Sequence, residues 1–411
     1  MTAEQKLSHY INKATELANQ SFEKKIRVAL LGSFTLNGLA ETLIVKCAEL
    51  KVQCATYVGG YNQYNQEILN PESDLYKFNP DISFLFIDTR TLLGDLYHHP
   101  YSVSTEERKK IIDKKLKEIL DLANGFCNKN NSKLVLANFD IPSFSSHGIY
   151  ESKVDYGFHR MITDLNTKLE ESVFDSDSVY VYNFAKFVSK YGESNIFDYK
   201  QFFFGDMKIS LDYIPHLAHD LMSYIIGYLG ISKKCIVLDL DNTLWGGVVG
   251  EDGFNGIKLG PEPPGNAFME LQKTLLSLYQ RGVILAINSK NNYDDAIKVI
   301  KEHPYMVLRE NNFACLKINW NDKVANMKEI ASELNIGLDS IVFLDDDPVN
   351  REYMRISLPQ VLTKDLTEDP SQYAALIKNM NEFSVLNITQ EDQQRGRMYV
   401  EKRMRDELEQ S

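Results

Sequence analysis

The chain has 411 residues, of which 44% are hydrophobic and 25% charged, and this is ordinary for a globular protein of two or three domains. Its 45 basic and 57 acidic side chains give a formal net charge of −12, so neither nucleic acid nor an anionic membrane is expected as a partner. No apolar run approaches the ~20 residues of a membrane-spanning helix, and the first residues lack the apolar core of a signal peptide.

The first half of the sequence alternates apolar strands with helical patterns. Strands are predicted at 25–31, 53–58, 82–87, 133–137 and 178–182, and helices at 39–50, 62–69, 105–125, 156–172 and 216–229. Continuous apolar strands that alternate with helices predict a parallel sheet covered on both faces. We therefore expect a first three-layer α/β domain over residues 1–229.

A second series of the same kind begins at Lys233. Strands are predicted at 233–239, 283–288, 313–318 and 341–344, and helices at 266–280, 293–301 and 322–334. This series predicts a second three-layer, Rossmann-like α/β domain over residues 230–380. The highly charged residues 381–411 predict a helical tail, which is either a solvated surface helix or a contact surface for a partner or a further domain.

Acidic and polar side chains follow the apolar strands of the second series. Asp239 and Asp241 follow one strand, Ser289 ends the next, Lys323 opens a helix, and Asp345 with Asp346 ends a third strand. Ligands bind at the carboxyl ends of strands in open α/β sheets. Each feature alone is common, but this order on successive strand ends indicates a single site.

Phosphoryl transfer explains this set of residues. Asp239 would attack phosphorus as a carboxylate nucleophile, and Asp241 would protonate the leaving oxygen and later activate water. A phosphate ester and a carboxylate repel each other, so we expect Mg²⁺ between them, held by Asp239, Asp345 and Asp346, with Asp241 adding its backbone carbonyl. Ser289 and Lys323 would hold the other phosphate oxygens.

These residues resemble the four motifs of the haloacid dehalogenase (HAD) superfamily of phosphotransferases. The strings at 238–253, 318–320 and 334–340 resemble its FkbH-like branch, phosphatase subfamily IIIC, most closely over residues 230–360. The resemblance implies Asp239 as nucleophile, Asp241 as acid and base, and a phosphorylated small molecule as substrate. The substrate-binding residues expected beside them are Thr243, Trp245, Gly246 and Asn288. The segment from Trp245 to Gly253 is too short for a large cap and predicts a small flap.

The same branch offers an alternative function. Some FkbH-like proteins transfer a glyceryl group from 1,3-bisphosphoglycerate to an acyl carrier protein, through a cysteine just before the serine of the second motif. Here that position is Asn288, which has no thiolate, so hydrolysis is the leading hypothesis. The five cysteines are scattered without a C-x-x-C pair, which favours a reducing cytoplasm. Longer relatives continue beyond the tail into an acyltransferase-like domain, so a shortened chain is one expectation.

The first domain resembles SGNH-type hydrolases loosely and is expected to be flavodoxin-like in fold. Ser33 ends its first strand as a candidate nucleophile, with Asp212, His216 and His219 as candidate base and orienting groups. The serine lies in G-S-F-T instead of G-D-S, and the acid and His216 are one residue too far apart. We therefore expect a degenerate scaffold or carrier-docking domain, with Ser33 capping the following helix.

Overall fold

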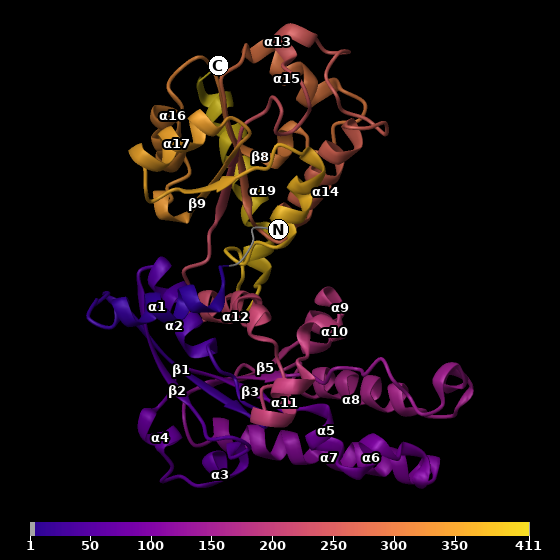
Figure 1. The fold of residues 1–411 in the computed structure, drawn as a ribbon. Coiled ribbons are helices and arrows are strands. Elements are labelled where there is room, and N and C mark those ends of the chain that lie inside the picture. Colours follow the sequence, from indigo (N-terminus) through magenta and orange to yellow (C-terminus); the bar gives the residue numbers. More distant parts are fainter. Residues whose placement is uncertain (1–4, 411) are drawn as a thin grey trace. The chain divides into compact units, whose positions relative to one another are not determined.

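The computed structural model describes residues 5–410, which form two compact units that divide between Ile225 and Ile226 (Figure 1). Each unit is built on its own five-stranded sheet, and every strand pair in both sheets is parallel. The predicted fold class, two α/β domains, is confirmed. No helix among the described residues is long and apolar enough to cross a membrane.

The sheet of the first unit has the order β2-β1-β3-β4-β5. Its strands are β1 (Lys24–Gly32), β2 (Val52–Val58), β3 (Ile82–Phe86), β4 (Lys133–Ala137) and β5 (Val179–Tyr182). Leu31, Leu85 and Leu136 belong to the core on one face of this sheet, and the alternate residues of the central strands β1, β3 and β4 are mostly buried too. A parallel sheet buried on both faces explains why the strands are continuously apolar.

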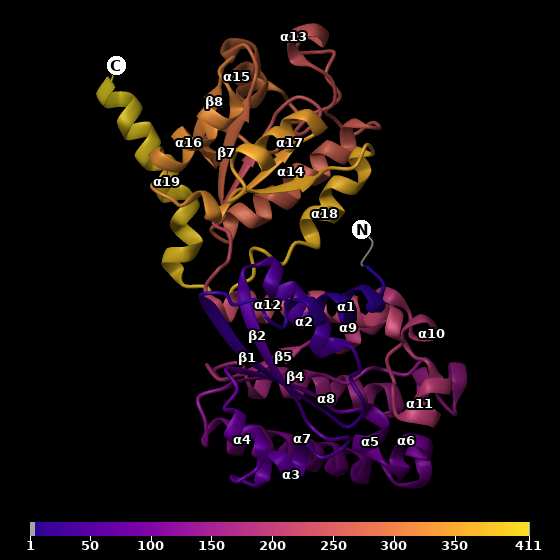
Figure 2. The same ribbon diagram turned by 60° about the vertical axis from the view of Figure 1, so that its left-hand side comes forward.

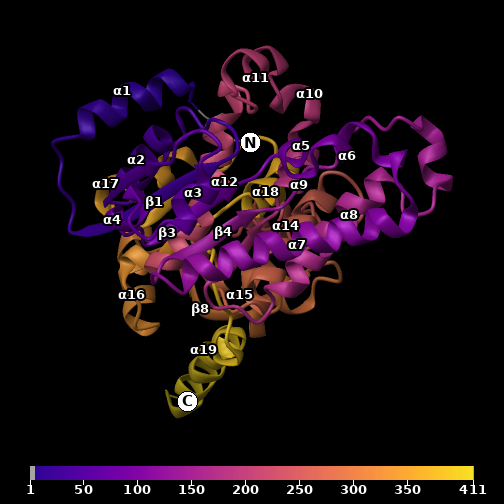
Figure 3. The same cartoon turned by 90° about the horizontal axis from the view of Figure 1, so that it is seen from below.

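Twelve helices of the described residues belong wholly or mainly to this unit. They are α1 (Leu7–Leu17), α2 (Leu39–Glu49), α3 (Tyr64–Leu69), α4 (Asp74–Phe78), α5 (Thr89–Leu93), α6 (Asp95–His98), α7 (Thr105–Cys127), α8 (Phe158–Ser172), α9 (Phe184–Tyr191), α10 (Glu193–Ile196), α11 (Tyr199–Gly205) and α12 (Ile214–Leu229). Helices α7 and α8 run side by side (Figures 1 and 3). The start of α7 is fixed by a capping box between Ser104 and Glu107.

The sheet of the second unit has the order β10-β9-β6-β7-β8. Its strands are β6 (Cys235–Leu238), β7 (Ile284–Ser289), β8 (Phe313–Ile318), β9 (Ile341–Asp345) and β10 (Leu362–Asp365). Its helices are α13 (Val249–Asp252), α14 (Gly265–Gln280), α15 (Tyr293–Glu302), α16 (Lys323–Glu333), α17 (Pro348–Ser357), α18 (Tyr373–Lys378) and α19 (Gln390–Gln410). On β6, Ile236 and Leu238 belong to one hydrophobic cluster, whereas Cys235 and Val237 belong to another. The strand therefore contributes side chains to the cores on both faces of the sheet.

The charged tail forms a largely exposed helix, and one side of it packs against the second unit. Helix α19 packs along β8 (Figure 2), and Val400 is buried in the core that also contains residues of α16. At the start of α19 the carbonyl oxygen of Asp392 approaches Gly282, whose φ of +105° and missing side chain permit this contact. Val400 and the partly buried Tyr399 therefore join a core of the second unit, while most described residues of α19 face solvent.

Candidate active site

The carboxyl ends of β6, β7 and β9 bring the predicted residues together. Asp239 directly follows β6, and its backbone N–H donates to the carbonyl oxygen of Leu344 on β9 at 2.9 Å. The ammonium group of Lys323, at the first position of α16, lies 3.1 Å from Asp239 Oδ2 and 2.5 Å from Asp345 Oδ2. All three side chains are almost completely buried. Lys323 and Asp345 lie 84 and 106 positions after Asp239 in the chain, yet the three side chains share one small polar site.

Three carboxylates at this edge form a group that could hold a metal ion. Asp239, Asp345 and Asp346 each offer an oxygen, and these oxygens lie within 4.8 Å of one another. Asp239 Oδ1 is buried and has no hydrogen-bond partner among the described residues. A buried carboxylate oxygen without a donor is costly unless a cation or ligand meets it. A set of hard oxygen ligands of this kind fits Mg²⁺.

The shifted pKa values of the cluster show an excess of negative charge, which favours binding of a cation. Burial, followed by the charges of Asp239 and Asp345, raises the pKa of Asp346 to about 6. Burial and the Asp239 charge also raise the pKa of Asp345, although Lys323 opposes them. Burial lowers the pKa of Lys323, but Asp239 and Asp345 more than compensate and raise it above its ordinary value. The single positive charge of Lys323 thus offsets only part of the negative charge of three neighbouring carboxyl groups. A bound divalent cation would reduce the remaining repulsion between them.

Asp241 is held apart from these three carboxylates by N–H donors. Its Oδ1 accepts hydrogen bonds from the indole Nε1 of Trp245 at 2.8 Å and from the backbone N–H of Val249 at 3.0 Å. Its Oδ2 accepts from Asn291 Nδ2 at 2.9 Å. The acidic group therefore contains three of the four predicted metal ligands, and the Asp241 side chain is aimed at the segment that follows β6.

That segment forms the small flap that the sequence predicts. Gly246 and Lys258 exchange two backbone hydrogen bonds, which close residues 246–258 around the short helix α13. Phe254 in this loop packs against His303 at a ring distance of 5.2 Å. Trp245 is completely buried beneath the flap, so its indole orients Asp241 instead of presenting a face to solvent.

The other two predicted substrate-binding residues are also completely buried. The hydroxyl of Thr243 has no hydrogen-bond partner among the described residues. Asn288 donates from Nδ2 to the carbonyl oxygen of Lys323 at 2.8 Å and accepts at Oδ1 from Asn326 Nδ2 at 3.2 Å. Both ends of the Asn288 amide are thus used to fix the first turn of α16, which carries Lys323.

Three further residues support the site and were not predicted from the sequence. Asn291 Nδ2 also reaches Ser289 Oγ at 3.2 Å, so it joins Ser289 to Asp241. Asn326 ties α16 to β7, and Arg351 donates to the backbone carbonyl of Asp345 at 2.8 Å. The position of Asn291, two residues after Ser289 at a strand end, was a usable signal. The other two lie inside helices, where nothing in the sequence marks them.

The candidate site of the first unit has a different arrangement. Ser33 is buried, and its Oγ accepts a 2.8 Å hydrogen bond from the backbone N–H of Asp88. The prediction that Ser33 caps the next helix is wrong, because α2 begins at Leu39 and its N-cap is Gly38. The His216 ring packs against Tyr191 and Tyr213, His219 is half-buried, and Asp212 is exposed.

The carboxyl edge of this first sheet is occupied by a buried ion cluster. Lys208 forms ion pairs with Asp88 and with Asp140, the latter at 2.9 Å. Burial alone would lower the pKa of Lys208, but the charges of Asp140 and Asp88 raise it instead. Asp88 also caps α5 through the N–H groups of Arg90 and Thr91. The acids beside Ser33 are therefore already paired with a side chain of the protein.

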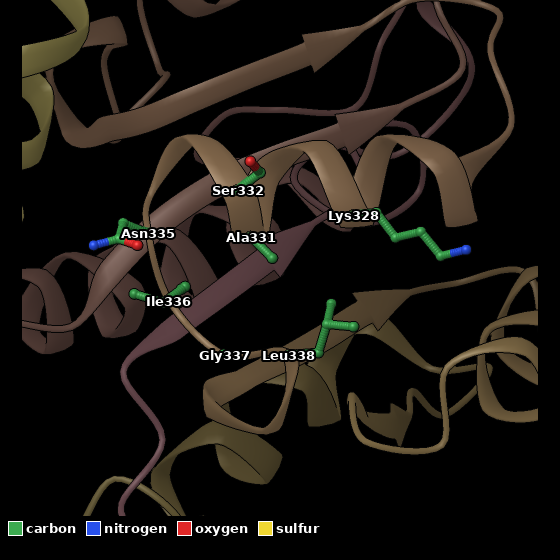
Figure 4. Close-up of a pocket in the computed structure, with 7 residues that line it drawn as sticks. All are labelled: Lys328, Ala331, Ser332, Asn335, Ile336, Gly337 and Leu338. Atoms are coloured by element: carbon green, nitrogen blue, oxygen red, sulfur yellow. The ribbon is translucent and has the colours of Figure 1, made fainter.

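A surface pocket in the second unit lies away from the carboxylates. Figure 4 shows it between the end of α16 and the loop before β9, lined by Lys328, Ala331, Ser332, Asn335, Ile336, Gly337 and Leu338. This loop enters β9 at its amino end, whereas Asp345 stands at the carboxyl end. The pocket is therefore separate from the candidate active site.

Comparisons with known proteins agree with this architecture. The FkbH N-terminal domain family matches residues 27–226. A solved structure of the N-terminal part of a Bacteroides fragilis protein, described as containing a phosphatase domain complexed with Mg, is 31% identical. That match covers 93% of this chain and 100% of the other, with a TM-score of 0.83. The chain belongs to the FkbH-like family.

Other matches are weaker. A solved structure of an acetyl xylan esterase is 17% identical over 49% of this chain and 100% of its own, with a TM-score of only 0.31. A search of curated proteins gave no significant match.

Proposed function

We propose that the protein is a Mg²⁺-dependent phosphatase of the HAD superfamily that acts through an aspartyl-phosphate on Asp239. The observation that carries this proposal is the group of carboxylate oxygens from Asp239, Asp345 and Asp346, which lie within 4.8 Å of one another. In this group Asp239 Oδ2 pairs with Lys323, and the buried Asp239 Oδ1 has no hydrogen-bond partner among the described residues. The related Bacteroides structure, with its phosphatase domain and Mg, supports the same chemistry.

The residues of the chain divide the reaction between them. The Asp239 carboxylate attacks phosphorus, and the bond to the leaving oxygen breaks as Asp241 donates a proton to that oxygen. Asp241, now ionised, then removes a proton from a water molecule, whose oxygen attacks the same phosphorus and releases phosphate and free Asp239. When bound by Asp239, Asp345 and Asp346, Mg²⁺ would offset the negative charge of the phosphate.

The remaining polar residues hold the phosphate and the acid in place. Ser289 would donate a hydrogen bond to one phosphate oxygen, and Lys323 would provide a fixed positive charge for another. Trp245 and Asn291 hold the two oxygens of Asp241 from opposite sides. Because these donors sit in a buried network, the acid needs little reorganisation during the reaction.

The substrate class that fits is a phosphorylated metabolite or an acyl phosphate. The alternative, glyceryl transfer to an acyl carrier protein, needs an acyl-accepting side chain before Ser289. Asn288 stands there, and it is buried with both ends of its amide bonded to α16. This arrangement supports hydrolysis over acyl transfer.

The direct test is release of inorganic phosphate from acetyl phosphate and a panel of phosphometabolites, with Mg²⁺ or with EDTA. We expect Mg²⁺-dependent release that Asp239→Asn abolishes. The matched control is Asp295→Asn, which changes an exposed aspartate on the first turn of α15 and should retain full activity. Equal turnover by Asp239→Asn and the unchanged protein would exclude the proposal.

A further inference from the structure

The two tryptophans of the chain lie in opposite environments. Trp245 is completely buried, whereas the side chain of Trp320 is 74% exposed. Tryptophan is largely buried on average in folded proteins, and exposed tryptophans are concentrated at binding surfaces. Trp320 contributes nothing to the hydrophobic clusters of the second unit. The exposure of Trp320 therefore favours a role in ligand binding over a role in packing the core.

The loop that carries Trp320 is rigid and directly borders the phosphate-binding residues. The backbone N–H of Asn319 donates to the carbonyl oxygen of Ser289 at 3.1 Å, and Asn319 Oδ1 accepts from the N–H of Asn321 at 2.9 Å. Asp322 then caps α16, whose first residue is Lys323. Trp320 thus lies in the four-residue loop 319–322. This loop is hydrogen-bonded to Ser289 at its start and leads into Lys323 at its end, and these are the two residues proposed to hold phosphate.

Asparagine side chains anchor this loop from beneath. Asn326 Nδ2 donates to Asn319 Oδ1 at 3.0 Å and to Asn288 Oδ1 at 3.2 Å, so the loop is tied to both β7 and α16. A loop anchored in this way loses little entropy when a ligand binds. The backbone that carries the Trp320 indole is consequently held next to Ser289 and Lys323.

The exposed neighbours of Trp320 indicate the chemistry of the ligand. Asn321 follows Trp320 in the loop, and Lys290 follows Ser289 at the end of β7. Both are exposed and offer an amide and an ammonium group. The face of an indole is electron-rich and attracts polarised C–H groups. A sugar ring has a face of C–H groups and an edge of hydroxyls, and it fits such an aromatic surface flanked by polar groups.

Resting on the phosphatase function proposed above, we propose that Trp320 is the specificity-determining residue that receives the ring of a sugar phosphate while Ser289 and Lys323 hold its phosphate. A phosphate without a ring, such as acetyl phosphate, gains nothing from this surface.

Kinetics with two kinds of substrate test the proposal. For a panel of hexose, pentose and amino-sugar monophosphates, Trp320→Ala should lower kcat/KM about tenfold relative to acetyl phosphate, mainly by raising KM. Trp320→Phe, which keeps an aromatic face, should restore most of this ratio. Ile356→Ala, which changes a similarly exposed apolar residue in the last turn of α17, is the matched control and should leave the ratio unchanged.

Tryptophan fluorescence gives a readout that does not depend on turnover. Because Trp245 is buried, acrylamide should quench mainly Trp320, and the best sugar phosphate of the panel should protect it. An unchanged substrate ratio in Trp320→Ala, or no protection by any sugar phosphate, overturns the proposal. Loss of phosphate release from every compound, with protection retained, would instead refute the phosphatase function and leave the sugar-phosphate site standing.

Discussion

Asn288 Nδ2 donates a 2.8 Å hydrogen bond to the carbonyl oxygen of Lys323, which joins the end of β7 to the first residue of α16. This contact uses the position that acyl-transferring relatives of the family are expected to fill with a cysteine. The residue at 288 therefore positions the lysine of the site, since both ends of its amide are bonded to α16.

Asn288→Cys should not create an acyl-transfer enzyme. The thiol would lie beneath α16, and loss of two hydrogen bonds should cost about 1–3 kcal/mol because the Lys323 carbonyl and Asn326 lose their partner. Chemical denaturation measures this cost, with Asn321→Cys as an exposed control. After incubation with 1,3-bisphosphoglycerate, intact-mass analysis should show no acyl adduct on the Asn288→Cys variant, and a stable adduct would contradict this assignment.

Trp245→Phe should slow catalysis while leaving the fold intact. Phenylalanine fills most of the buried space but removes the indole N–H that donates to Asp241 Oδ1 at 2.8 Å. We expect kcat to fall about tenfold, less than the ~10²–10⁴-fold loss expected for Asp241→Asn, which removes the acid itself. The two variants are compared by phosphate release from one substrate. If Trp245→Phe raises KM and leaves kcat unaltered, Trp245 acts on substrate binding and the positioning role is wrong.

The crowded carboxyl group of Asp346 predicts a pH dependence of the metal-free protein. Its pKa is raised from 3.8 to about 6 in the folded state, so the protonated form stabilises the fold. This contribution is complete below pH 3.8 and is lost as the pH rises through about 6. In EDTA, Asp346→Asn should therefore show a smaller decrease of Tm than the unchanged protein between pH 5 and 7.5.

Mg²⁺ should act in the opposite sense. It binds the ionised carboxylates, so it should raise Tm more at pH 7.5 than at pH 5, and its binding should release a proton near pH 6. Calorimetry in buffers of different ionisation enthalpy measures this proton. Equal stabilisation by Mg²⁺ at both pH values would show that Asp346 does not belong to the metal site.

The buried ion cluster of the first unit should be a strong determinant of its stability. Lys208→Met would leave the charges of Asp88 and Asp140 buried without a partner, at a cost of about 3–5 kcal/mol. Lys77→Met breaks an exposed ion pair with Asp74 and should cost less than about 1 kcal/mol. Urea denaturation of the full chain compares the two. Similar midpoints for both variants would mean that the cluster is dispensable for the fold.

The sequence was sufficient to predict that Asp239, Ser289, Lys323 and Asp345 lie at the carboxyl edge of the second sheet. Carboxyl ends of parallel strands share an edge of the sheet, so polar residues after apolar strands must meet there. Asn288 and Ser289 are equally buried, so their burial does not distinguish them. The prediction of Asn288 as a substrate-binding residue did not take account of its hydrogen bonds to the Lys323 carbonyl and to Asn326.

Other features depend on contacts that no local pattern records. Strand β10 is four residues long and reads Leu-Thr-Lys-Asp, so it lacks an apolar run and forms only because β9 offers a free edge. Val400 ends a short Met-Tyr-Val run in a charged helix, and its burial requires the core beneath α19. The orientation of the Asp241 carboxylate is fixed by hydrogen bonds from Val249 and Asn291, which lie 8 and 50 residues further along the chain.

The most direct test of the account is to locate the phosphoryl group on the protein during turnover. Full-length protein is mixed with Mg²⁺ and radiolabelled acetyl phosphate, quenched in acid and mapped by peptide mass analysis. The account predicts a hydroxylamine-sensitive acyl phosphate on Asp239, absent from Asp239→Asn. Steady phosphate release with the label on another residue, or with no covalent label at any time point, would contradict it.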